Sequence, residues 1–242
     1  MKPFFLLLLA VALAMAESPD ERFRNAVTAM SGGDYGEAAY ELRELVNEGH
    51  FSHGSLHNLG NAEWKVVRPG HAILAWERAQ LTDPHDANTV ANLAFARRTA
   101  ELPIPTLAWH ESYSAWLGAN AWLAAASLGF WGGVSLLTLP RLLGMNRADW
   151  HQGVAALLLA VFLFTIPALV GLKARGSLGV AIGDDTALRL TPTRDGEKLV
   201  ELPAGSVARV EKVRGDYVYV RADGDRAGWI HRTGFERIWP ER

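Results

Sequence analysis

Two long segments in the middle of the chain, residues 112–140 and 152–172, contain no Asp, Glu, Lys or Arg. Each is longer than the roughly 18 uncharged residues that are typical of a membrane-spanning helix. The polar loop between them, residues 141–151, is too short to form a domain. Because lipid offers no hydrogen-bond partners to the backbone, we expect each segment to form a helix and the two to form a transmembrane hairpin.

The two segments differ in how strongly they favour lipid. The second has 12 Leu, Ile, Val or Phe residues between Gly153 and Leu172, which supply roughly −4 to −7 kcal/mol of insertion free energy. The first has only 8 such residues between Trp116 and Leu139. Its small residues would let a partner helix approach closely, and three tryptophans suit the two membrane interfaces. The residues concerned are Gly118, Gly129, Gly132, Gly133, Trp109, Trp116 and Trp150. The alternative is a pair of buried helices in a soluble protein.

The N-terminus has the pattern of a secretory signal peptide over residues 1–16. Lys2 precedes an apolar run, and Ala14-Met15-Ala16 forms an A-x-A cleavage site. The alternative is an uncleaved signal anchor that adds a third span. Basic residues flank both ends of the second segment, so charge alone leaves the topology open. With a cleaved signal peptide, we expect a multi-pass protein of the bacterial inner membrane whose N-terminal and C-terminal domains are both extracytoplasmic.

Residues 17–101 contain an internal repeat. When the sequence is compared with itself at an offset of 34 residues, apolar and small positions coincide. Residues 87–100 match the first helix of a third copy. This spacing, with small residues where helices cross, resembles the tetratricopeptide (TPR) pattern. The coinciding pairs are Ala26 with Gly60, Ala38 with Ala72, Leu42 with Trp76, and Leu45 with Ala79.

Stacked helix pairs of this kind form a concave groove. We expect four asparagines to hold the backbone of a bound peptide there, although a solvated helix surface is the alternative interpretation. The asparagines are Asn58, Asn61, Asn88 and Asn92.

Residues 102–111 follow the repeats, and their two prolines predict a stiff, extended spacer into the bilayer.

Residues 173–242 change to short β-rich runs separated by turn residues, which predict a small barrel. Leu202-Pro-Ala-Gly205 followed by Gly228-Trp229-Ile230 resembles bacterial SH3-type domains, and this resemblance implies an SH3-like barrel. Four aromatic residues could line a groove for peptide or glycan, or could simply pack the sheet: Tyr217, Tyr219, Trp229 and Phe235. The predicted strands are residues 178–182, 187–190, 198–202, 207–213, 216–221 and 227–231.

Several classes of chemistry are disfavoured. The chain has no cysteine, which excludes disulfides and thiolate metal sites, and its net charge of −2 argues against nucleic acid. Nucleotide-binding loops, GxSxG and HExxH motifs are absent from the sequence, so we expect neither an enzyme nor a cofactor. His50, His53 and His57 are the best metal candidates, but no fourth ligand is evident and we expect no metal site.

The sequence as a whole predicts a multidomain α plus β protein with, in order, TPR-like repeats, a transmembrane hairpin and an SH3-like barrel. It resembles the BatE-type membrane proteins of the bacterial aerotolerance (Bat) operon, most closely at residues 55–62 and 72–79. The resemblance implies a non-enzymatic membrane scaffold whose partners are von Willebrand A-domain proteins and a MoxR-type ATPase. The alternative is an envelope sensor whose SH3-type domain binds cell-wall glycopeptide.

Overall fold

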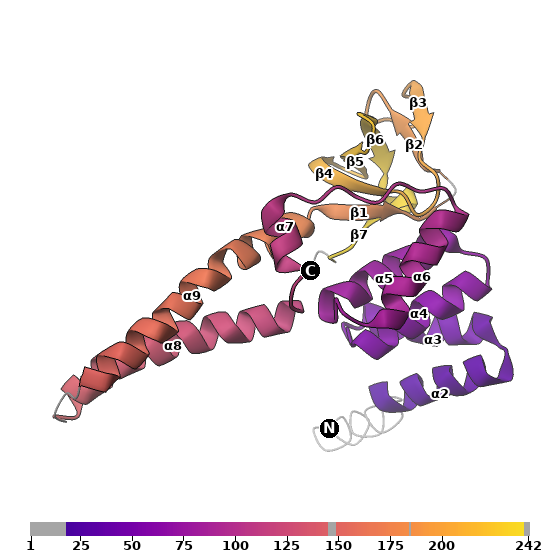
Figure 1. The fold of residues 1–242 in the computed structure, drawn as a ribbon. Helices are drawn as coiled ribbons and strands as arrows, with labels where there is room; N and C mark the ends of the chain where they lie inside the picture. The colour runs from indigo at the N-terminus through magenta and orange to yellow at the C-terminus, as the bar shows by residue number, and fades with distance from the viewer. Residues whose placement is uncertain (1–17, 145–148, 184, 240–242) are drawn as a thin grey trace, which may run out of the picture.

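The structure is a computed structural model that describes residues 18–144, 149–183 and 185–239. The predicted signal peptide and residues 145–148 of the predicted loop lie outside this range. The described chain has a mixed α and β fold in three parts: a stack of helices, a long helical hairpin and an antiparallel sheet (Figure 1).

The helical stack contains five helices. The first helix of each repeat begins at residue 19, 53 or 87, which is a spacing of 34 residues. Most begin at a Ser or Asp whose side chain accepts a backbone N–H of the first turn, as at Ser18, Asp34, Ser52 and Asp86. The helices are α2 (Pro19–Gly32), α3 (Tyr35–Asn47), α4 (His53–Lys65), α5 (Pro69–Thr82) and α6 (Ala87–Thr99).

Helix packing in the stack follows the 34-residue repeat. All eight residues that coincide at this offset are buried, which is why the same small or apolar residues recur. Two ion pairs join neighbouring helices: Arg43 of α3 with the buried Glu63 of α4, and Arg97 of α6 with Glu77 of α5. Isolated buried carboxylates are costly, so these pairs constrain how the helices can pack.

The first apolar segment is not one continuous helix from residue 112. A short helix α7 (Trp109–Ser114) ends before α8 (Ala119–Leu142) begins. Gly118 lies between them against the end of α5, where a Cβ atom would sit 2.2 Å from the Thr82 carbonyl oxygen. The chain turns over residues 115–117, and the indole of Trp122 donates to the Ser114 carbonyl at 3.0 Å.

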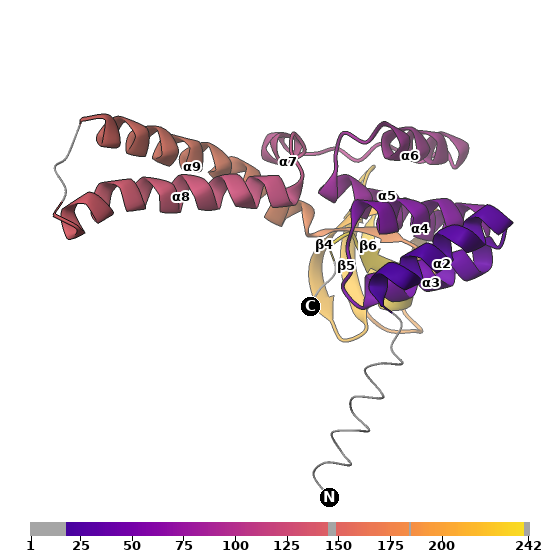
Figure 2. The ribbon, with the colours of Figure 1, turned by 90° about the horizontal axis from the view of Figure 1, so that it is seen from below.

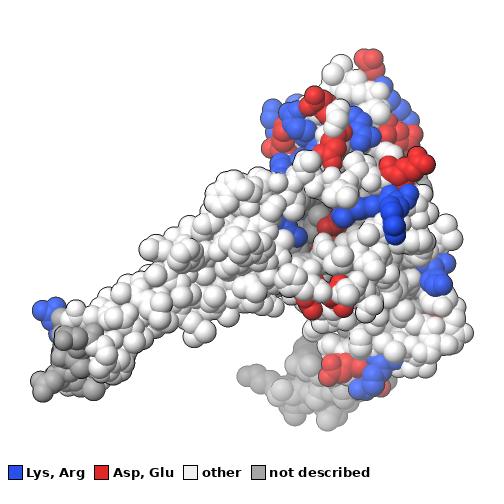
Figure 3. Space-filling view, viewed as in Figure 1, with Lys and Arg blue, Asp and Glu red and all other residues white. Residues whose placement is uncertain are grey.

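Helices α8 and α9 (Asp149–Arg175) form the predicted pair of apolar helices. At 24 and 27 residues they are about 36 and 40 Å long, enough to cross a hydrocarbon layer of about 30 Å. Only 22% and 17% of their most apolar stretches are buried. In Figure 3 the side of the hairpin in view has no charged side chain between its tip and α7.

Glycines allow α8 and α9 to approach closely. A Cβ atom on Gly129 would lie 2.8 Å from the Leu158 carbonyl oxygen, and one on Gly133 would lie 2.7 Å from the Leu159 side chain. Gly129 and Gly133 therefore face the partner helix, as expected from the sequence, whereas Gly118 packs against α5.

The C-terminal region forms a seven-stranded sheet with the order β3-β2-β6-β5-β4-β1-β7, and every neighbouring pair is antiparallel. Six strands fall within two residues of the predicted bounds, and β7 was not predicted. The sheet is open between β3 and β7 over the described residues, whereas a barrel was expected. The strands are β1 (Leu178–Ala181), β2 (Ala187–Arg189), β3 (Lys198–Glu201), β4 (Val207–Arg214), β5 (Tyr217–Ala222), β6 (Ala227–His231) and β7 (Phe235–Arg237).

The sheet packs directly on the helical stack (Figure 2). One apolar cluster combines Trp76 and Leu93 of the stack with Val180 of β1 and Ile238 after β7. Residues 102–108, predicted as a spacer into the bilayer, instead run back along this junction. Leu102 is buried in the same cluster. The stack and the sheet therefore share a core.

The hairpin is anchored at its base to the sheet. Glu111 of α7 is almost fully buried and accepts a hydrogen bond from Arg209 of β4 at 2.7 Å. The same guanidinium donates to the Ala174 carbonyl and the Ser177 hydroxyl at the end of α9. Arg209 thus connects the sheet, α7 and α9.

Candidate functional site

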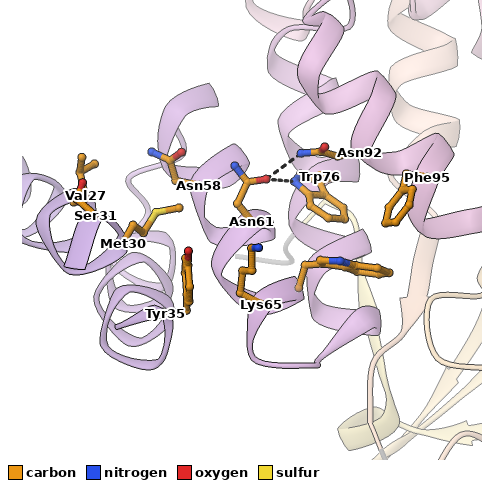
Figure 4. A pocket seen from close by; sticks show the side chains of 11 residues that line it. Val27, Met30, Ser31, Tyr35, Asn58, Asn61, Lys65, Trp76, Asn92 and Phe95 are labelled. Carbon is orange, nitrogen blue, oxygen red and sulfur yellow. Dashed lines mark hydrogen bonds between the residues drawn. The ribbon is translucent and has the colours of Figure 1, made fainter. Parts of the chain in front are cut away.

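The helical stack has an open groove of about 530 Å³ that all five of its helices line (Figure 4). The predicted residues Asn58 and Asn61 of α4 and Asn92 of α6 lie in it. Asn88 is exposed and does not line it. The lining residues are Val27, Met30, Ser31, Tyr35, Asn58, Asn61, Trp64, Lys65, Trp76, Asn92 and Phe95.

Asn61 is the centre of a small polar network in this groove. Its side-chain oxygen accepts the indole N–H of Trp76 at 3.3 Å and the amide N–H of Asn92 at 2.8 Å. These two bonds fix the amide, so its own NH₂ group is left as a donor. The side chain of Asn58 has no hydrogen bond to any described residue. The groove therefore offers several unused amide donors and acceptors.

Aromatic rings line much of the rest of the groove. The Trp64 ring lies 5.9 Å from that of Trp76 and 5.8 Å from that of Phe95, both measured between centroids. On the opposite side, the Lys65 ammonium lies over the Tyr35 ring at 5.7 Å. Sequence reasoning missed these rings, although the repeat places Trp76 where the first copy has Leu42. An apolar wall facing unused amides suits an extended peptide.

Gly60 positions the central tryptophan. A Cβ atom at this residue would lie 2.4 Å from the indole nitrogen of Trp76, closer than real Cβ contacts. The absence of a side chain at Gly60 therefore lets the indole reach Asn61.

The C-terminal aromatic residues divide between two faces of the sheet. Tyr219 of β5 is paired with Trp229 of β6, their rings 5.4 Å apart and edge to face, and Tyr217 is the next residue on the same face. Phe235 lies in the core on the other side, 4% exposed, against Gly179. It sits there because β7 pairs with β1 rather than with β5 or β6. The structure therefore brings three of the four predicted residues together.

A second cluster of polar side chains lies at the start of α4. His53 and His57 are joined there by Asp86, the residue that caps α6, and His50 does not take part. Burial lowers the pKa of His57, with Asp86 acting in the opposite direction. Hydrogen bonds from Thr89 lower the pKa of the Asp86 carboxyl. Sequence analysis did not identify Asp86 as a member of this cluster, because it lies 29 residues from His57.

Comparison with known proteins yields no relative for this chain: no family profile, curated protein or solved structure matches it.

Proposed function

We propose that this chain is a non-enzymatic membrane scaffold that holds an extended segment of another envelope protein in the groove of the helical stack. The observation that carries the proposal is the Asn61 network, which leaves amide groups facing an aromatic wall. Amides of this kind bind peptide main chain irrespective of its sequence, and the rings add apolar contact. On this view the stack is a TPR-like array and the sheet an SH3-like domain.

Membrane attachment is supported by the hairpin. Its exposed apolar side chains extend over the length of both helices, far beyond the patches usual on soluble monomers. Trp109 and Trp116 are exposed near the base and Trp150 near the tip, which suits the two interfaces of a bilayer. In such an arrangement the groove lies on the same side of the membrane as the sheet, and we place both outside the cytoplasm.

The partners proposed are von Willebrand A-domain proteins and the MoxR-type ATPase that the Bat resemblance implies. The test places a photo-crosslinking amino acid at Ser31, on the groove wall, in the full-length protein in its host membrane. We expect a crosslink to an A-domain protein or the ATPase, recovered in mild detergent. If the intact protein recovers neither, the scaffold proposal is wrong.

Two matched variants make the test specific to the groove. Replacement of Asn58 and Asn61 by alanine should lower the crosslinking yield at least tenfold, because each removes an amide from the groove. Replacement of Asn88 by alanine should leave the yield unchanged, since this asparagine is exposed on α6 and does not line the groove. Equal losses in both variants would contradict peptide binding in the groove.

The second candidate function is an envelope sensor that binds cell-wall glycopeptide through the sheet. It is favoured by the shared face of Tyr217, Tyr219 and Trp229, since aromatic rings commonly stack on sugars. Full-length protein in detergent should then sediment with purified wall sacculi, and replacement of Trp229 by alanine should abolish this. Sedimentation that is independent of Trp229 would remove this candidate.

A further inference from the structure

His53 and His57 lie one turn apart on α4, so their rings share one face of the helix. The rings are stacked with their centroids 5.9 Å apart. Asp86 approaches them from the N-terminus of α6. Its Oδ2 atom lies 3.5 Å from Nε2 of His53 and 3.8 Å from Nδ1 of His57. One potential ligand atom from each residue therefore lies within 4.8 Å of the other two.

We infer that His53, His57 and Asp86 bind one divalent transition-metal ion, with Zn²⁺ the best fit. In a tetrahedral zinc site with bonds of about 2.0–2.1 Å, neighbouring ligand atoms are about 3.3 Å apart. The observed separations from the Asp86 oxygen are only a few tenths of an ångström longer. The ligand atoms of the two histidines lie within 4.8 Å of each other, so rotation of these partly exposed side chains is needed to close the site.

The position of the His53 ring suits this assignment. Its Nδ1 atom lies 3.3 Å from the Ala79 carbonyl oxygen, which can accept a hydrogen bond from this nitrogen. This contact orients the ring so that Nε2 faces the Asp86 carboxylate, where an ion can bind to both. Backbone carbonyls orient metal-binding histidines in this same way.

Thr89 contacts two of the three proposed ligands, Asp86 and His57. The Asp86 carboxylate accepts the Thr89 backbone N–H at 2.7 Å. The Thr89 hydroxyl, which is fully buried, lies 2.7 Å from Nδ1 of His57. When Nδ1 of His57 binds the ion, its hydrogen bond to this hydroxyl must break, and the hydroxyl can then donate to the Asp86 carboxylate. Ligating carboxylates are usually hydrogen-bonded in this manner.

Nitrogen and oxygen ligands of this kind suit Zn²⁺ and its neighbours in the first transition row better than Ca²⁺ or Mg²⁺, which prefer oxygen alone. Three protein ligands leave one position for water. Bound there, the ion would join α4 to α6, the same two helices that the Asn61–Asn92 hydrogen bond joins in the groove. The assignment itself does not depend on what the groove binds.

The test uses the full-length protein without a histidine tag, purified in detergent, stripped with a chelator and titrated calorimetrically with ZnCl₂. We expect one ion per chain with a micromolar or lower Kd. His53→Gln, His57→Gln and Asp86→Asn should each weaken binding at least tenfold. Asparagine is as good a helix cap as aspartate, so Asp86→Asn preserves α6. Should this variant nevertheless misfold, the Zn²⁺ affinity of His53→Gln tests the site in its place.

The matched control is His50→Gln, a histidine three residues from His53 that takes no part in the cluster. Its Zn²⁺ affinity should equal that of the unchanged protein. Zn²⁺ should also raise the melting temperature of the unchanged protein and of His50→Gln, but not of the ligand variants. The inference is overturned if the unchanged protein binds no Zn²⁺ at a ZnCl₂ concentration of about 100 μM. It is also overturned if His50→Gln weakens binding as much as Asp86→Asn does.

Discussion

The guanidinium of Arg78, in the middle of α5, donates to the backbone carbonyl of Ile238, 160 residues later, at 2.9 Å. The same group donates to the Arg237 carbonyl at 2.8 Å and pairs with the Glu236 carboxylate at 2.6 Å. Arg78 is 8% exposed. Residues 236–238 are therefore tied to the helical stack by one buried side chain.

Replacement of Arg78 by glutamine should destabilise the protein by about 3 kcal/mol, because the carbonyls of the buried Ile238 and of Arg237 and the Glu236 carboxylate lose their donor. Unfolding in detergent, followed by circular dichroism, measures this change. The control is Arg98→Gln, since Arg98 is exposed and bonds only within its own helix. A similar loss in both variants would contradict a specific role for Arg78.

Replacement of Gly60 by alanine should destabilise the stack by about 1–2 kcal/mol. The added methyl group meets the Trp76 indole, and this overpacking outweighs the better helix propensity of alanine. Gly32→Ala is the matched control, because α2 leaves open space around Gly32. That variant should gain up to about 1 kcal/mol in a thermal unfolding measurement. Stabilisation of both variants would show that the Gly60–Trp76 contact is not tight.

The hairpin predicts a specific labelling pattern. The chain has no cysteine, so single cysteines can be introduced without removing any. Because the stack and the sheet share a core, Thr28→Cys and Asp195→Cys should react with a membrane-impermeant thiol reagent from the same side. Arg141→Cys, at the far end of α8, should react only from the other side. Labelling of all three residues in intact cells would contradict a transmembrane hairpin.

The sequence predicted the elements with regular patterns better than the contacts between them. The 34-residue spacing located α2 to α6, and turn residues bounded six strands, because both signals are local. The strand β7 was missed since Phe235–Arg237 is short and is held by pairing with β1. The Glu111–Arg209 ion pair joins residues 98 positions apart, and no local pattern indicates it.

The groove shows the same difference between local patterns, which the sequence reveals, and long-range packing, which it does not. Spacing along α4 and α6 was enough to bring Asn58, Asn61 and Asn92 to one place. These three residues line the groove and Asn88 does not, because the packing of five helices determines where the groove ends. In the same way, the pattern of histidines led to His50, whereas the third member of the cluster is Asp86, the cap of another helix.

The stability of the helical stack should depend on pH through two histidines. Burial is the largest influence on His57 and His71, and it lowers the pKa of each below the ordinary value of 6.5. The unfolded chain therefore binds more protons than the folded one as the pH falls through 6.5, and folding loses free energy there. Above pH 6.5 this contribution is complete and constant.

We therefore expect the melting temperature in detergent and chelator to fall between pH 7.5 and pH 5.5. The variant with His57→Gln and His71→Gln should show a smaller fall over the same range. His50→Gln should keep the full dependence of the unchanged protein. A rise in melting temperature on acidification would contradict the lowered pKa of His57 and His71 in the folded protein.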